Sequence, residues 1–202
     1  EEGVRSLVLD SVVPNELALG NEFARNLSEA LDAQFANCAA RPACAAAYPD
    51  PRASLMRLRS ALREQPREVR YPDPIGFKPE TARLDDYALA GLVRLFAYSP
   101  ETAALIPHTV EQALAGKEAP LMGQIGVITQ GMEELAGSGM QLSVVCSEDS
   151  ESMVPRAEDE GTVLGNLMPS GMAAMCKVWP KGRVPADFHQ PLATKVPALV
   201  LE

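Results

Sequence analysis

The two ends of the chain carry the apolar segments that most restrict its fold. The segment VRSLVLDSVVP spans residues 4–14, and VPALVLE spans residues 196–202. Both are rich in Val and Leu and both are bordered or interrupted by proline, so each predicts a short β-strand. Because an isolated pair of strands is only marginally stable, we expect these strands to belong to a larger parallel sheet.

The sequence between these strands predicts a mainly helical body. Apolar residues recur at helical spacing in four long stretches, which we expect to form one bundle-like core: residues 16–40, 53–65, 85–99 and 101–136. Within the last stretch, separate helices are expected over residues 100–116 and 119–139, and Pro107 should kink the first of these. Prolines and Gly76 interrupt residues 66–84 and predict a small, ragged hairpin. A weaker helix is expected within 157–178, before the proline-rich, extended segment 178–195.

A third strand is predicted at residues 140–146, MQLSVVC. Its central segment, Leu142–Val145, is short and apolar except for Ser143. Cys146 follows, and the acidic residues Glu148, Asp149 and Glu151 come directly after it. We therefore expect the strand to end in a thiol and a cluster of negative charge.

The chain has four cysteines, which allow three disulfide connectivities. The most economical pairing joins Cys38 to Cys44, across the turn expected at Pro42, and Cys146 to Cys176. Two disulfides imply an oxidising compartment, so a secreted or periplasmic protein is predicted. The alternatives are four buried thiols or a zinc site, but the spacing is not CxxC and no metal or cofactor is expected.

The overall charge argues against nucleic-acid binding. The net charge is -9, and no dense run of Lys and Arg is present. No apolar run approaches the ~20 residues that a membrane-spanning helix requires. Hydrophobic residues make up 47% of the chain and aromatic residues only 5%, which favours closely packed helices over an aromatic-rich β-sandwich.

Four segments together resemble one branch of a known enzyme family. These segments are VRSLVLDSVVP, SVVCSED, CKVWPKGRVPADFHQP and VPALVLE. They are similar to the tripeptidyl-aminopeptidase-like branch of the α/β-hydrolases, which are serine peptidases and esterases related to proline iminopeptidases. The resemblance covers essentially the whole chain, and its most specific parts are CSED and CxVWP with the following VPADF.

The resemblance implies the domain organisation and the activity. Residues 1–14 and 196–202 would be strands of the α/β-hydrolase core sheet, and residues 15–195 would be its helical cap, or lid. The chain would belong to a secreted serine aminopeptidase that releases N-terminal residues or short peptides. The nucleophile motif GxSxG would lie before the first strand, and the acid and histidine of the triad after the last one. The chain contains no GxSxG, so we expect it to lack the Ser-His-Asp triad and to shape and gate the pocket of a separate catalytic core.

Glu148 and Asp149 are the main candidates for substrate binding. An aminopeptidase must bind a free α-ammonium group, and a carboxylate pair in a partly dry pocket provides charge-assisted hydrogen bonds of the right sign. The expected partner is thus a peptide with a free N-terminus, although acidic clusters are more often solvated loops.

Other residues of the sequence have weaker claims to a functional role. Asp10 could face the cleft or cap a turn, and Trp179 could line the pocket or pack beside the Cys146–Cys176 bridge. The family pattern gives His189 no triad role.

Two other functions remain open at the sequence level. The same cap could belong to an esterase, in which case the acidic pair would be incidental. The chain could also be a stand-alone secreted helical binding module, since fold analogy alone does not determine function.

The missing nucleophile motif predicts that this chain has no hydrolase activity by itself. It should not hydrolyse aminoacyl or tripeptidyl chromogenic substrates or p-nitrophenyl esters above the buffer rate. Stoichiometric labelling of any serine by a fluorophosphonate, read by mass spectrometry, would contradict the cap assignment.

Overall fold

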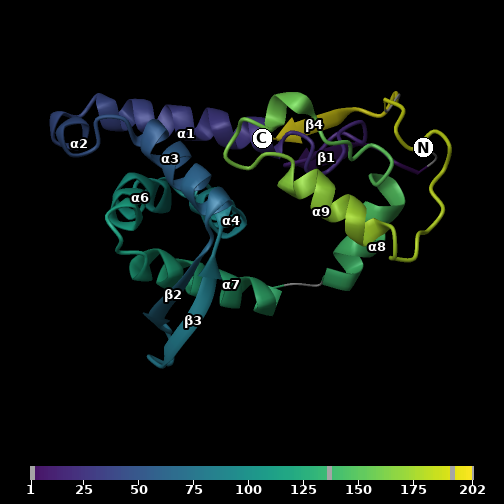
Figure 1. Cartoon of the computed structure of the whole chain (residues 1–202). Helices are drawn as coiled ribbons and strands as arrows, with labels where there is room; N and C mark the ends of the chain where they lie inside the picture. The colour runs from purple at the N-terminus through teal and green to yellow at the C-terminus, as the bar shows by residue number, and fades with distance from the viewer. Residues whose placement is uncertain (1–2, 136–137, 192–193, 202) are drawn as a thin grey trace. The chain divides into compact units, whose positions relative to one another are not determined.

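The computed structural model describes residues 3–135, 138–191 and 194–201, with the side chains of residues 128–138 outside that description. The chain is mainly helical, with a few short strands (Figure 1). It divides into two compact units. We call residues 22–138 and 155–168 the bundle unit, and residues 1–21, 139–154 and 169–202 the strand unit.

The bundle unit contains most of the helices. In chain order they are α1 (Phe23–Ala39), α2 (Pro42–Ala47), α3 (Pro51–Glu64), α4 (Asp86–Phe96), α5 (Pro100–Ala103), α6 (Ile106–Leu114), α7 (Ala119–Leu135) and the 3₁₀-helix η1 (Ala157–Asp159). Helix α3 packs against α6 and α4, and α7 packs against α4 and α6.

Local sequence signals explain where several of these helices begin. The Asp50 carboxylate accepts a hydrogen bond from the backbone N–H of Ala53 at 2.9 Å, and Pro51 follows at the first position of α3. The Asp85 carboxylate caps α4 in the same way, accepting from Ala88 at 3.0 Å. Such caps satisfy N–H groups that the helix leaves unpaired, and proline is preorganised for the first turn.

The predicted bundle-like core is confirmed. Buried side chains from α1, α3, α4, α6 and α7 form one continuous cluster, with Leu58, Leu62, Leu84 and Leu89 completely buried. Val163 and Leu164 from the later segment join the same cluster. Full burial of each of these aliphatic side chains contributes about 1.5–3 kcal/mol to stability, so they account for much of what holds the unit together.

The predicted hairpin is also confirmed. Strands β2 (Arg67–Pro72) and β3 (Pro79–Leu84) pair antiparallel, with Val69 opposite Ala82. Figure 1 shows the hairpin beside α7, which agrees with the packing of α7 on β2. Val69 and Tyr71 point into the core, because alternate residues of a strand share one face.

Three helices of the structure differ from their predicted extents. Helix α1 begins at Phe23 and not at residue 16, since Gly20 adopts a positive φ of 96° that a right-handed helix cannot contain. Pro107 lies in the first turn of α6, so the chain breaks before it and does not kink at it. Only residues 157–159 and 167–176 are helical within the predicted span 157–178.

The strand unit contains the two terminal strands as neighbours. Strands β1 (Leu7–Asp10) and β4 (Ala198–Leu201) pair in parallel, with Leu7 opposite Ala198 (Figure 1). All four residues of β4 are exposed. Pairing of the two ends was expected, whereas their membership in a wider sheet stays a prediction.

The predicted strand at 140–146 is wrong, because these residues belong to helix α8 (Ser138–Glu148). Leu142, Val145 and Cys146 have the spacing of one helical face, and Leu142 and Val145 pack with Met153 and Met172 in a small second core. A short apolar run does not by itself distinguish a buried strand from a buried helix. The tertiary contacts of this face decide in favour of the helix.

Both predicted disulfides are present. Cys38 bonds to Cys44 beside the start of α2, and Cys146 of α8 bonds to Cys176 at the end of α9 (Leu167–Cys176). The second bridge joins two helices whose shared core has three buried members among the residues with described side chains, Val145, Met153 and Met172. The strand unit therefore depends more on its disulfide than the bundle unit does.

This difference predicts unequal effects when the bridges are removed. Replacing Cys146 and Cys176 by Ser should destabilise the strand unit by about 3–4 kcal/mol, the loop-closure value for a separation of 30 residues. Replacing Cys38 and Cys44 removes a bridge across six residues, worth about 2–2.5 kcal/mol, from a unit with a large core. Hydrogen exchange of the α8 amides would measure the effect. Equal loss of α8 protection in both double variants would contradict it.

Candidate functional site

The acidic residues singled out in the sequence lie at the end of α8. Glu148 is its last residue, and the backbone N–H of Asp149 donates to the Val145 carbonyl at 2.9 Å, continuing the helical pattern by one residue. Cys146 is completely buried and bonded to Cys176. Both acidic residues are half-buried. We call residues 148–151 the acidic turn, and its position is set by the adjacent disulfide.

The end of a helix adds its own charge to this turn. The unpaired carbonyl groups at a helix C-terminus carry a partial negative charge, so carboxylates are unfavourable there and cations are favourable. Glu148, Asp149 and Glu151 are therefore at the end of α8 where acids do not stabilise the helix. The arrangement is suited instead to holding a positively charged group.

One such cation belongs to the chain itself. The ring of His189 bonds through Nδ1 to the carbonyl oxygen of Asn15 at 2.7 Å and through Nε2 to that of Glu148 at 2.9 Å. A carbonyl oxygen can only accept, so both bonds form together only when the ring carries a proton on each nitrogen, and they favour that charged form. The bond to Asn15 is the main cause that raises the pKa of His189, and the bond to Glu148 and the charges of Asp149 and Glu148 act in the same direction.

The carboxylates of Glu148 and Asp149 differ in their hydrogen-bond partners. Asp149 Oδ2 accepts a hydrogen bond from the backbone N–H of Leu19 at 3.2 Å, and Asn21 donates nearby to the Ser152 carbonyl at 2.8 Å. Asp149 therefore helps to hold residues 15–21 against the acidic turn. The Glu148 carboxylate makes no hydrogen bond or ion pair with the described part of the chain, which leaves it available to a ligand.

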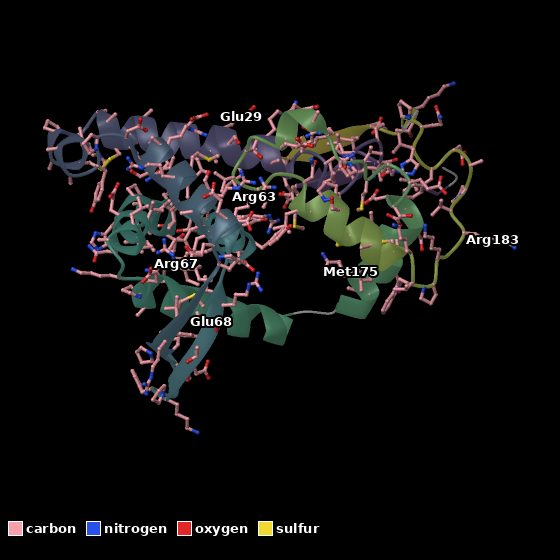
Figure 2. The ribbon with its side chains drawn as sticks, in the orientation of Figure 1. Glu29, Arg63, Arg67, Glu68, Met175 and Arg183 are labelled. Atoms are coloured by element: carbon pink, nitrogen blue, oxygen red, sulfur yellow. A yellow bond between two sulfur atoms is a disulfide. The ribbon has the colours of Figure 1, made fainter. Side chains whose placement is uncertain are left out.

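A proline-rich segment, residues 178–189, lies along α8, and we call it the strap. Three serines of α8 and the acidic turn bind it: Ser143 accepts from Trp179 Nε1 at 3.1 Å, Ser147 from the N–H of Gly182 at 2.8 Å, and Ser150 from Lys181 Nζ at 2.8 Å. Their spacing, i, i+4 and i+7, places them on one helical face. Figure 2 shows Arg183 extending outward from the strap.

Trp179 is placed on α8 by these contacts. Its indole ring is half-buried and lies over Gly139, where an added Cβ would come within 3.8 Å of the ring. The sequence left a choice between packing beside the disulfide and lining a pocket. The contacts with Ser143 and Gly139 place the ring against the first half of α8, on its serine face.

Asp10 lies apart from the acidic turn, at the end of β1. It is exposed and accepts a hydrogen bond from Ser11 Oγ at 3.2 Å, and Ser11 has a positive φ of 51°. This geometry fits the turn-forming alternative for Asp10.

The described residues contain no group of three or more His, Cys, Asp or Glu side chains that could hold a metal ion. None of the described helices combines the length and the apolarity needed to cross a membrane.

No protein-family model, no curated protein and no solved structure matches this chain. The α/β-hydrolase resemblance therefore rests on the quoted sequence segments alone.

Sequence reasoning missed the contribution of His189 to this site. Its partners lie 174 and 41 residues away in the sequence, so no local pattern indicates them. The serine face of α8 did have a signal, because Ser143, Ser147 and Ser150 recur at helical spacing. That signal was hidden by the prediction of a strand for the same residues.

The two hydrogen bonds of His189 predict a pH-dependent stability for the strand unit. Because folding raises the pKa of His189, its contribution is complete below the unfolded-state pKa of about 6.5 and is lost as the pH rises through the folded-state pKa. Urea unfolding followed across this range should show stability falling with pH.

Two variants separate this effect from other titrations. His189→Gln should remove the pH dependence, whereas His108→Gln should retain it, since His108 bonds to Tyr48 in the bundle unit. A neutral His189 ring at about pH 6, read from its ¹⁵N chemical shifts, would contradict the assignment.

Proposed function

We propose that the chain is the cap of a secreted serine exopeptidase, in which Glu148 binds the free α-ammonium group of a peptide substrate. The observation that carries this proposal is the Glu148 carboxylate, half-buried at the negative end of α8 and without a partner among the described residues. The Cys146–Cys176 bridge holds it in place. The catalytic serine, histidine and acid would come from an α/β-hydrolase core.

The charges around the acidic turn support binding of one more cation. Glu148, Asp149 and Glu151 bring three carboxylates, which the Lys181 ammonium and the protonated form of His189 only partly offset. A net negative charge therefore remains, which suits a single ammonium group. An internal peptide segment presents a neutral amide there and would gain no charge-assisted bond.

Two further features support the cap assignment. Strands β1 and β4 are parallel neighbours, and parallel strands require a long crossover connection, which the helical body between them supplies. Two disulfides fit an extracellular protein, as expected for a secreted or periplasmic enzyme.

The proposal predicts that the chain distinguishes free from blocked peptide N-termini. Trialanine amide should bind at the acidic turn, and its N-acetylated form should bind at least tenfold more weakly. Glu148→Gln should weaken binding of the free peptide about ten- to a hundredfold, the loss of one charge-assisted bond of roughly 1.5–3 kcal/mol, and should leave the acetylated form unaffected. NMR titration of the α8 amides measures both affinities.

Matched variants identify the residue responsible. Glu151→Gln removes an exposed acid of the same turn and should have a much smaller effect. Equal affinity for free and acetylated peptides would reject recognition of the N-terminus and leave the esterase cap as the better assignment. Absence of peptide binding by the folded chain would favour a solvated acidic loop. In the enzyme that contains this cap, the same substitution should raise KM only for substrates with a free N-terminus.

A further inference from the structure

The bundle unit contains a hollow that the proposed function does not use. It lies between α1 and the end of α4 and has a volume of about 240 Å³. Helix α1 contributes Phe23, Asn26 and Leu27 to its lining, and the α4 side contributes Arg94 and Tyr98. Apart from Asn26, Arg94 and the Tyr98 hydroxyl, these side chains offer apolar surface.

Arg94 is held in one orientation at the wall of this hollow. Its guanidinium carbon lies 4.6 Å from the centre of the Phe23 ring and 5.3 Å from that of Tyr98. Its Nη2 donates to the Tyr98 hydroxyl at 2.8 Å. Stacking on aromatic rings fixes the plane of a guanidinium group and leaves the N–H groups at its edge.

The remaining N–H groups of Arg94 do not bond to any carboxylate of the described residues. Guanidinium has five N–H donors, and no carboxylate pairs with Arg94 among the described residues. Some other arginines of the bundle unit do pair with acids: Arg67 pairs with Glu118, and Arg156 with Glu22 and Asp159. A second hollow, at the start of β2, is lined by Arg67, Arg70 and Lys117, but Glu68 and Glu118 line it too and offset part of that positive charge (Figure 2 labels Arg67 and Glu68).

We propose that the hollow between α1 and α4 binds a small organic carboxylate that has an apolar body. The planar fork of Arg94 matches a carboxylate in a bidentate geometry, and the apolar part of the ligand would cover Leu27 and the Phe23 ring. Asn26 lies where it can bond a second polar group. The volume is below the roughly 300–1,000 Å³ of sites for drug-sized ligands, so the ligand is about the size of one N-acylated amino acid.

The alternative for this arrangement is an arginine that only covers two aromatic rings. Arginine stems commonly pack on apolar surface while the head stays in water. That role needs neither a hollow nor an unpaired edge, and it gives no discrimination between a carboxylate and its neutral amide. The two roles therefore differ in a measurable property.

The test compares N-acetyl-leucine with N-acetyl-leucinamide on the full chain. The acid should bind with a Kd on the order of 1 mM, as expected for a ligand of this size, and the neutral amide at least tenfold more weakly. Chemical-shift changes should be centred on the Asn26 side-chain amide and the Arg94 Nε–H. Inorganic phosphate should not displace the acid, because it has no apolar body.

Variants of Arg94 decide between the two roles. Arg94→Gln should weaken binding of the acid at least tenfold, and Arg94→Lys by less, because charge is kept and the bidentate geometry is lost. Arg63→Gln, on α3 outside the hollow (Arg63 is labelled in Figure 2), is the matched control and should bind normally. Thermal unfolding verifies that each variant is folded.

Several outcomes would overturn this proposal. Three results would show that Arg94 only covers the two aromatic rings. These are equal binding of the acid and the amide, no saturable chemical-shift change with the acid, or unchanged affinity in folded Arg94→Gln. Displacement by phosphate would reassign the hollow to simple anions. None of these outcomes bears on Glu148, which belongs to the strand unit, so the two proposals fail independently.

Discussion

The Cys146–Cys176 disulfide is the interaction on which the strand unit depends. Its three buried core residues provide little of the apolar burial that stabilises the bundle unit. The bridge limits the separation of α8 and α9 in the unfolded chain and so replaces part of that missing stability. Cys146 also lies two residues before Glu148, so the same bridge that stabilises the unit fixes the position of the acidic turn.

Around that anchor, hydrogen bonds over long sequence separations assemble the acidic turn. His189 joins Asn15 to Glu148, and Leu19 binds Asp149. These contacts assign different roles to two acids that look equivalent in the sequence. Asp149 is occupied in holding the chain, whereas Glu148 retains a carboxylate at a helix end that favours cations. The proposed recognition of a peptide N-terminus follows from this difference.

In the bundle unit, the arginines differ in the groups that hold them. Its core is aliphatic and continuous, and several of its arginines are paired with acids at the surface. Arg94 is instead stacked between Phe23 and Tyr98. Exposed ion pairs contribute little to stability, so an arginine that is oriented by aromatic rings and not by an acid is the more informative one. Its position in a hollow makes it the second candidate site of the molecule.

Local patterns in the sequence predicted most helices of the bundle unit and the hairpin between Arg67 and Leu84. Helical spacing and proline breaks are short-range properties, so one sequence suffices to read them. The two disulfides were expected only as the most economical of three pairings, because the Cys146–Cys176 bridge spans 30 residues. Tertiary structure alone decided that residues 140–146 are helical, that His189 bonds to two distant carbonyl oxygens, and that Arg94 lies over two aromatic rings. Each of these features depends on partners far away in the chain. For residues 140–146, the tertiary contacts outweigh the small local preference between helix and strand in a short apolar run.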